Sequence, residues 1–292
     1  MKTFFLDPQR RLRNGWKALA FFAVLAAILT PLMLALYHLP ALKHAVPKVV
    51  VIDIGMLLAT WACVRAEGRT LASVGWNPGW KSGGQLLLGL AGGAGLLLLA
   101  ALLVWLGDGV HLLRTPDVAA WSVLRTAGVW LGVGVMEELA YRGYPMQRAI
   151  RGLGVRGGMV LFAVLFCLSH PLDAAMSVGV MGVAMLDIFL FALVESLLWW
   201  RTGSLAASIG LHMGWNWMQQ TLGFGVSGIE SHGAWTPVFH GMPDWLTGGA
   251  FGLEASLAAT VAATLALLGL IRWRPAAGAD AGLPAAVEPG LT

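Results

Sequence analysis

Charged residues are scarce in this chain of 292 residues: only 12% are Asp, Glu, Lys or Arg, whereas 58% are hydrophobic. Soluble domains carry about 25% charged residues, so the composition excludes an ordinary soluble protein and indicates an integral membrane protein. Cysteine is nearly absent as well. The two cysteines, Cys63 and Cys167, both lie in apolar runs, which argues against a structural disulfide and excludes a cysteine-ligated zinc site.

Long apolar runs dominate the rest of the chain, and about 20 apolar residues are needed to cross a bilayer as a helix. The predicted fold class is all-α, a polytopic transmembrane helix bundle of about eight helices. The first run follows a basic N-terminus, is too long for a signal-peptide core and lacks a cleavage site, so we expect a retained anchor helix. The expected spans are 16–37, 47–64, 83–106, 121–147, 157–173, 176–200, 203–222 and 250–271.

The net charge of +4 has a topological explanation and does not require a nucleic-acid partner. With the N-terminus inside, most basic residues fall on the cytoplasmic side, as the positive-inside rule demands. We therefore expect both termini in the cytoplasm and a multi-pass protein of the cell membrane, most simply a bacterial inner membrane. The expected cytoplasmic residues are Lys2, Arg10, Arg11, Arg13, Lys17, Arg65, Arg69, Lys81, Arg142, Arg148, Arg151, Arg156, Arg201, Arg272 and Arg274. The expected outside residues are Lys43, Lys48, Arg114 and Arg125.

The chain is expected to form one domain. Residues 1–274 would make the transmembrane bundle, and 275–292, rich in Pro, Ala and Gly, would be a disordered tail. The longest outside loop, about 223–249, contains no Lys or Arg. No inverted sequence repeat is recognisable, which slightly disfavours a transporter.

Two adjacent acids, Glu137 and Glu138, end an apolar run, and Arg142 follows one helical turn later. A charged side chain at the bilayer centre costs about 2.5–3.5 kcal/mol on insertion scales, so two neighbouring carboxylates need a reason. Glu138 and Arg142 are four residues apart and are expected to form an ion pair on one helix face. Glu137 projects about 100° away from that face, so it is not part of the pair and is available as a catalytic group. The alternative is a structural ion-pair network that includes both acids.

Three further polar residues lie in two apolar segments downstream, His170 in one and His212 with Asn216 in the other. If the fourth span continues to about Arg148, Glu137 lies about 16 Å from the cytoplasmic boundary at 1.5 Å per residue. The same arithmetic places His170 at about 20 Å and His212 at about 15 Å. The similar depths predict that these side chains share one intramembrane cavity. Taken alone, the His212–Asn216 pair could equally join two helices, and His170 could be an ordinary interior histidine whose helix is distorted by the proline that follows it.

Other polar residues in the apolar runs leave alternatives open. Cys167, one turn before His170, could be a nucleophile, although a small buried thiol is the more common role. Asp53, Asp187 and Glu195 could form the proton path of a proton-coupled transporter, or could pair with polar groups between helices. Glu195 could also approach the membrane interface near Arg201.

Taken together, the motifs resemble the CPBP family of CAAX proteases and bacteriocin-processing enzymes, which includes the eukaryotic type II CAAX prenyl endopeptidases. Each motif lies on its own apolar segment and in the family's order. The resemblance covers about residues 121–222, and the first three helices and the last one lie outside it. The matching motifs are Glu137-Glu138-x-x-x-Arg142, Phe166-x-x-x-His170 and His212-x-x-x-Asn216.

The resemblance implies an intramembrane endopeptidase that cleaves membrane-associated or lipidated peptides or proteins. It implies Glu137 as the general base for a water that His170 helps to hold. It also implies that His212 and Asn216 donate hydrogen bonds to the developing oxyanion, while the ion pair beside Glu137 fixes the helix and tunes the base. The predicted site residues are Glu137, Glu138, Arg142, His170, His212 and Asn216.

The cofactor is left open, because members of the family are often described as metalloproteases. Glu137, His170 and His212 are candidate ligands for zinc, with one open position for a water. The chain lacks a His-x-x-x-His pair in these motifs and Asn is a poor zinc ligand, so a glutamate-activated water is slightly favoured. The expected partners are the lipid bilayer and a membrane-associated peptide or protein. In a bacterial membrane, peptide maturation, protein sorting or bacteriocin self-immunity is favoured over a prenylated client.

Overall fold

A computed structural model of the chain describes residues 2–39, 46–170 and 176–273. Eight long helices account for most of this part of the chain, which confirms the predicted all-α bundle. These helices are α2 (Asn14–His38), α4 (Lys48–Ala66), α5 (Trp80–Leu106), α6 (Ala120–Tyr141), α7 (Tyr144–Ser169), α8 (Val178–Thr202), α9 (Leu205–Thr221) and α11 (Leu257–Arg272). The short elements are α1 (Lys2–Phe5), η1 (Leu71–Val74), α10 (Asp244–Thr247) and η2 (Leu253–Ala255).

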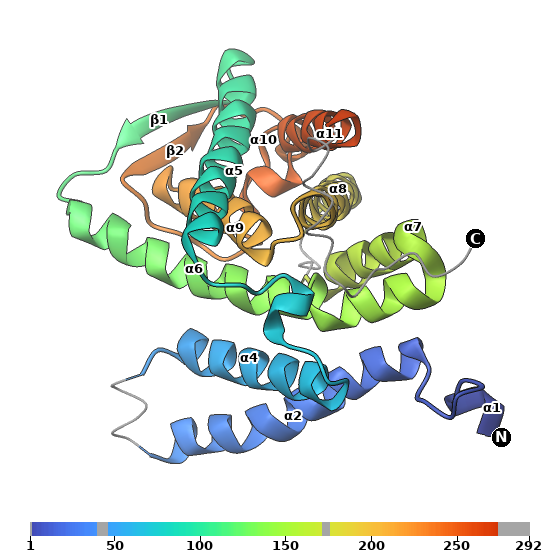
Figure 1. The fold of residues 1–292 in the computed structure, drawn as a ribbon. Helices are drawn as coiled ribbons and strands as arrows, with labels where there is room; N and C mark the ends of the chain where they lie inside the picture. The colour runs from blue at the N-terminus through green and yellow to red at the C-terminus, as the bar shows by residue number, and fades with distance from the viewer. Residues whose placement is uncertain (1, 40–45, 171–175, 274–292) are drawn as a thin grey trace.

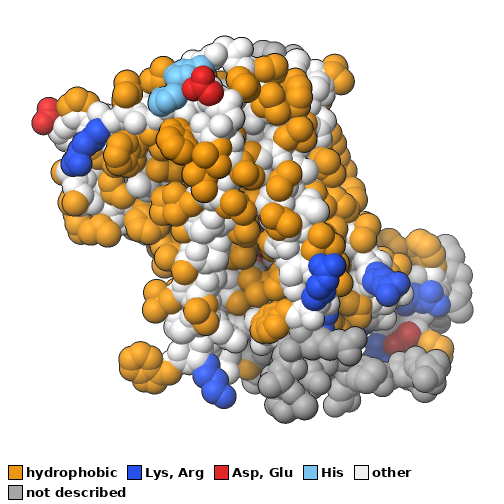
Figure 2. All heavy atoms as spheres, turned by 90° about the horizontal axis from the view of Figure 1, so that it is seen from above, with side chains coloured by type: hydrophobic (Ala, Val, Ile, Leu, Met, Phe, Trp, Pro, Cys, Tyr) orange, Lys and Arg blue, Asp and Glu red, His pale blue; other side chains and the backbone are white. Residues whose placement is uncertain are grey.

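The helices form three layers (Figure 1). The α2–α4 hairpin packs against one side of α6 and α7, and α5, α8, α9 and α11 lie on the other side. Five segments are long and apolar enough to cross a membrane, with α6 and α7 counted as one segment, and α11 is a shorter apolar helix. Hydrophobic side chains cover most of the face seen in Figure 2. The chain is therefore a multi-pass membrane protein, and the predicted cytoplasmic position of its termini stays a prediction.

The fourth predicted span, 121–147, is longer than the helix that the structure shows. It was expected to reach residue 147, with the helix continuing past Arg142, but α6 ends at Tyr141 and α7 begins at Tyr144. The cause is local: Pro145 has no N–H to donate, and its ring would collide with the carbonyl of Tyr141 in a continuous helix. As a result Arg142 is the C-cap residue that follows α6, and its side chain turns back along the helix to Glu138.

Two other boundaries differ from the expected ones. The fifth span begins at Tyr144 instead of residue 157 and bends at Gly154, where a φ of +76° is easily adopted only without a Cβ. The last span begins at Leu257 instead of residue 250. His170 follows α7 in an extended conformation, as expected for a residue before proline. The distortion predicted at Pro171 and the tail predicted over 275–292 lie outside the described residues.

A small antiparallel ribbon, which the sequence analysis did not predict, links the two longest connections. Strand β1 (Val110–Arg114) follows α5, and β2 (Trp235–Phe239) lies in the segment expected to be a loop. Val110 pairs with Phe239 and Arg114 with Trp235. The ribbon therefore ties the α5–α6 connection to the segment that leads from α9 to α11.

The closest helix packing joins α5 to α9, and it depends on four glycines. Gly89 and Gly93 on α5 face Gly210 and Gly214 on α9, each pair having the four-residue spacing typical of close membrane-helix contacts. A Cβ at any of the four would lie within 3 Å of the backbone of the opposite helix. Because His212 lies between Gly210 and Gly214, this contact fixes the position of the helix that carries it.

We expect Gly93→Ala and Gly214→Ala each to destabilise the protein by about 1–3 kcal/mol, because the added methyl group forces two backbones apart. Gly95→Ala is the matched control on the same helix, since a Cβ there meets no atom within 4 Å. Thermal unfolding in detergent would measure the difference. Equal midpoints for Gly93→Ala and Gly95→Ala would contradict the packing role.

A polar cluster around Glu67 attaches the α2–α4 hairpin to α7. Glu67, which follows α4, accepts an ion pair from Lys17 at 3.0 Å and one from Arg148 at 2.8 Å, and the Tyr144 hydroxyl donates to it at 2.9 Å. Burial alone would raise the pKa of Glu67, but Arg148 and Lys17 outweigh burial and hold the pKa below its usual 4.5.

A carboxylate with a lowered pKa in the folded state stabilises the protein above its unfolded pKa, and that contribution is lost as the pH falls through the folded value. We therefore expect wild type and Glu67→Gln to differ in unfolding free energy at pH 7 and to converge below about pH 4.5. Denaturant titrations of both proteins across this range would test it. A difference that stays constant from pH 7 to pH 3 would contradict the assignment.

Candidate active site

Arg142 lies completely inside the protein, between acids from two helices. Its Nη1 is 2.9 Å from Glu138 Oε1, and its Nη2 is 2.5 Å from Glu195 Oε2. Nη2 also donates to the carbonyl of Ala192 at 3.2 Å, and the guanidinium lies 4.5 Å from the centre of the Phe166 ring. The Glu138–Arg142 pair expected from the spacing is present, and a second acid completes it.

Glu195 is the site-associated residue whose role the sequence analysis missed. The alternatives expected for it were a proton path with Asp53 and Asp187, an interhelical pairing, or a position at the interface near Arg201. It is 0% exposed, on the buried face of α8. The sequence signal was present: a second acid in an apolar helix needs a cation, and Arg142 is the buried cation it meets. Asp53 lies on α4 beside Gly132 of α6.

His212 contacts three carboxylates through its two ring nitrogens. Nδ1 lies 3.0 Å from Glu138 Oε1 and 3.1 Å from Glu195 Oε1, and Nε2 lies 3.5 Å from Glu137 Oε2. Ionised carboxylates only accept hydrogen bonds, so Nδ1 carries a hydrogen. The two buried acids therefore hold the ring in one orientation and leave Nε2 facing Glu137.

A cavity of about 540 Å³ lies on the Nε2 side of His212. Glu137, His170, His212 and Asn216 all line it, whereas Glu138 and Arg142 are buried behind it. The Nδ1 of His170 donates to the carbonyl of Phe166 at 2.8 Å, which leaves its Nε2 as the basic nitrogen of the neutral ring. Glu137 keeps 23% of its side chain accessible, so this carboxylate, unlike Glu138, is open to the cavity.

Two more acids line the cavity, and the sequence analysis assigned neither to the site. Asp187 is on α8, and Glu254 is in η2, just before α11. Glu254 accepts hydrogen bonds from Gln219 at 3.0 Å and from the Ser227 hydroxyl at 2.8 Å. Glu254 was expected inside the last membrane span, where a lone acid was a signal that could have found it.

The arrangement of the donor atoms bears on the predicted zinc ligands. Glu138, Glu195 and His212 form a compact buried group, but their facing atoms already bind Arg142 and share the Nδ1 hydrogen. A metal there would have to displace these contacts. The predicted pair of Glu137 and His212 fits better, because its 3.5 Å separation is near the roughly 3.3 Å edge of a tetrahedral site with 2.0–2.1 Å bonds. A second group, Asp108, His111 and His240, is exposed on the β1–β2 ribbon, outside the cavity.

Comparison with known proteins gives one result for this part of the chain. Residues 119–218 match the family model described as type II CAAX prenyl endopeptidase Rce1-like. The resemblance to the CPBP family is confirmed. No curated protein matches the chain. The match runs from the start of α6 to near the end of α9, so it contains all six predicted site residues and Glu195. It supports a CAAX-type intramembrane protease acting on a membrane-associated substrate.

Removing the central cation tests the buried network. Arg142→Gln leaves Glu138 and Glu195 without a counter-charge, so we expect a loss of about 3–5 kcal/mol in the free energy of unfolding. The control is Arg65→Gln, which removes an exposed arginine from the last turn of α4. Unfolding by denaturant in detergent would measure both, and equal losses would contradict the network.

Proposed function

We propose that the chain is an intramembrane endopeptidase that uses Glu137 to activate a water. The observation that carries the proposal is the pairing of an accessible carboxylate with an oriented imidazole. Glu137 and His212 Nε2 lie 3.5 Å apart in a cavity that His170 and Asn216 also line. This arrangement offers a base, two hydrogen-bond donors and room for a substrate carbonyl.

Each proposed step uses one of these groups. Glu137 takes a proton from a water that His170 helps to hold, and the water oxygen bonds to the carbonyl carbon of the scissile peptide. His212 and Asn216 donate to the oxygen on which negative charge develops, a contribution of about 2.7–4 kcal/mol for one such donor. When the C–N bond breaks, the protonated Glu137 gives its proton to the leaving amine, which restores the carboxylate.

The metal-free mechanism and the zinc-assisted mechanism require different protonation states of His212 Nε2. A donor to the oxyanion needs a hydrogen on Nε2, whereas a zinc ligand needs a free lone pair there. Arg142 balances only one of the two acids that it contacts, and a protonated His212 would balance the other. This charge count favours the water mechanism without zinc. If zinc were bound by Glu137, His170 and His212, it would supply a more acidic water and polarise the carbonyl.

The cavity walls indicate the substrate class. Apart from the polar site residues, they are formed by aromatic and aliphatic side chains, including Trp130, Met136, Ile188, Phe191 and Trp215. Such walls accept an extended hydrophobic peptide, as in the hydrophobic C-terminal region of a membrane-associated or lipidated protein. The proposed location is a bacterial inner membrane, and the proposed substrate carries no prenyl group.

The direct test compares the membrane peptidome of cells that produce wild type with that of cells that produce Glu137→Gln. We expect new hydrophobic C-terminal fragments in wild type and a loss of about 100- to 10,000-fold in cleavage of the identified substrate by the variant, because Gln cannot take a proton. Asp117→Asn, which removes an exposed carboxylate before α6, is the matched control.

Full activity of Glu137→Gln would overturn the proposed base. Activity of the purified wild type that persists in a strong chelator would support the metal-free version. Activity that a chelator abolishes and zinc restores would replace it with the metal-assisted version. His170→Ala and His212→Ala with full activity would overturn the site while leaving the family match intact.

A further inference from the structure

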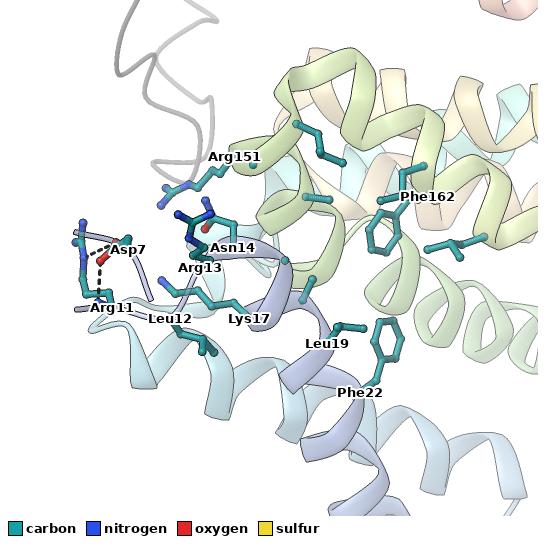
Figure 3. Close-up of a pocket in the computed structure, with 17 residues that line it drawn as sticks. Asp7, Arg11, Leu12, Arg13, Asn14, Lys17, Leu19, Phe22, Arg151 and Phe162 are labelled. Atoms are coloured by element: carbon teal, nitrogen blue, oxygen red, sulfur yellow. Dashed lines mark hydrogen bonds and ion pairs between the residues drawn. The ribbon is translucent and has the colours of Figure 1, made fainter. Parts of the chain in front are cut away.

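A second cavity, of about 660 Å³, lies between the N-terminal part of α2 and α7, away from the proposed active site (Figure 3). Four cationic side chains and one acid line it, together with an apolar wall. The charged lining residues are Arg11, Arg13, Lys17, Arg151 and Asp7. The surplus of positive charge indicates an anionic ligand.

The charged and apolar parts of the cavity are separated in space. Figure 3 shows the cationic groups gathered at one end, and Leu19, Phe22 and Phe162 at the other. The wall beyond them is open to the surroundings: Leu161 and Leu165 are 39% and 41% exposed. A ligand that fits both parts has an anionic head and an apolar chain.

Among the described residues, the cationic end carries more positive charge than the acids beside it balance. Asp7 pairs with Arg11 at 3.3 Å, and Lys17 shares Glu67 with Arg148. Arg13 uses its Nε to donate to a backbone carbonyl at 3.3 Å, which leaves its terminal amino groups at the mouth. Arg151 on α7 faces this group from the opposite wall.

The N-terminal segment places this end at the membrane surface. Phe4 and Phe5 are 64% and 44% exposed and pack edge-on or tilted against Trp16, with ring centres 5.4 and 4.9 Å away. Such an aromatic group beside basic residues is typical of the headgroup region. From Gly154 to Leu165 α7 rises about 16 Å at 1.5 Å per residue, close to the roughly 15 Å of hydrocarbon in one leaflet.

We propose that this groove binds an anionic glycerophospholipid, with its phosphate between Arg13 and Arg151 and one acyl chain along Leu161 and Leu165. A zwitterionic lipid of the same chain length would bind less tightly, because its own cation is repelled by the arginines. Bound lipid would then contact both α2 and α7, in a groove that no other described long helix lines.

Binding of phosphatidylglycerol and phosphatidylcholine with identical acyl chains to the delipidated full-length protein in detergent tests the proposal. We expect wild type to prefer phosphatidylglycerol, and Arg13→Gln/Arg151→Gln to weaken its binding about 30-fold, at roughly 1 kcal/mol per cation. Arg65→Gln/Lys81→Gln removes two exposed cations outside the groove and should leave the preference unchanged. Equal effects of the two double variants would overturn the site.

Two further measurements distinguish a lipid from a free anion. They also test the proposal if the double variant fails to fold. Leu165→Trp fills the apolar wall without removing charge, and should weaken binding of phosphatidylglycerol several-fold. Inorganic phosphate at the same concentration should not displace the lipid. Unchanged lipid binding in Leu165→Trp, or displacement by phosphate alone, would overturn the lipid assignment.

Discussion

The structure around the proposed active site depends on one buried interaction, in which Arg142 binds Glu138 of its own helix and Glu195 of α8. An acid alone at this depth would be costly, and an arginine alone would be costly too. Together they form a group that connects α6 to α8, and through His212 to α9. Separating the partners would leave a buried charge without its counter-charge, which is strongly destabilising. The network therefore holds the three helices in place relative to one another.

This network also explains the orientation of the proposed catalytic groups. Nδ1 of His212 donates a hydrogen bond to Glu138 and lies beside Glu195, and this arrangement directs Nε2 toward Glu137 and the cavity. The neighbouring positions on α6 have different roles: Glu138 is fully buried in the network, and Glu137 stays accessible. The contact of α9 with α5 through four glycines supports the same arrangement from the other side. In the proposed mechanism Glu138 thus positions the site and Glu137 acts as the base.

Much of this was predictable from sequence, because hydropathy and residue spacing act locally. The apolar runs predicted eight helices, and the four-residue spacing of Glu138 and Arg142 predicted their pair. The end of α6 was also encoded locally, by Pro145, and the prediction overlooked it. The role of Glu195 was not readable in the same way: it depends on how α8 packs against the end of α6, a contact between residues more than 50 positions apart. The β1–β2 ribbon is likewise a long-range pairing without a hairpin signal.

The central claim is that Glu138 and Glu195 hold the hydrogen of His212 on Nδ1 and so turn Nε2 toward Glu137. Nitrogen NMR of protein labelled with ¹⁵N-histidine reads the protonation of each ring nitrogen, with His212 assigned by comparison with His212→Gln. The account predicts a protonated Nδ1 in wild type and a changed Nε2 signal in Glu137→Gln. A His212 ring with a bare Nδ1 and its hydrogen on Nε2 would contradict the account.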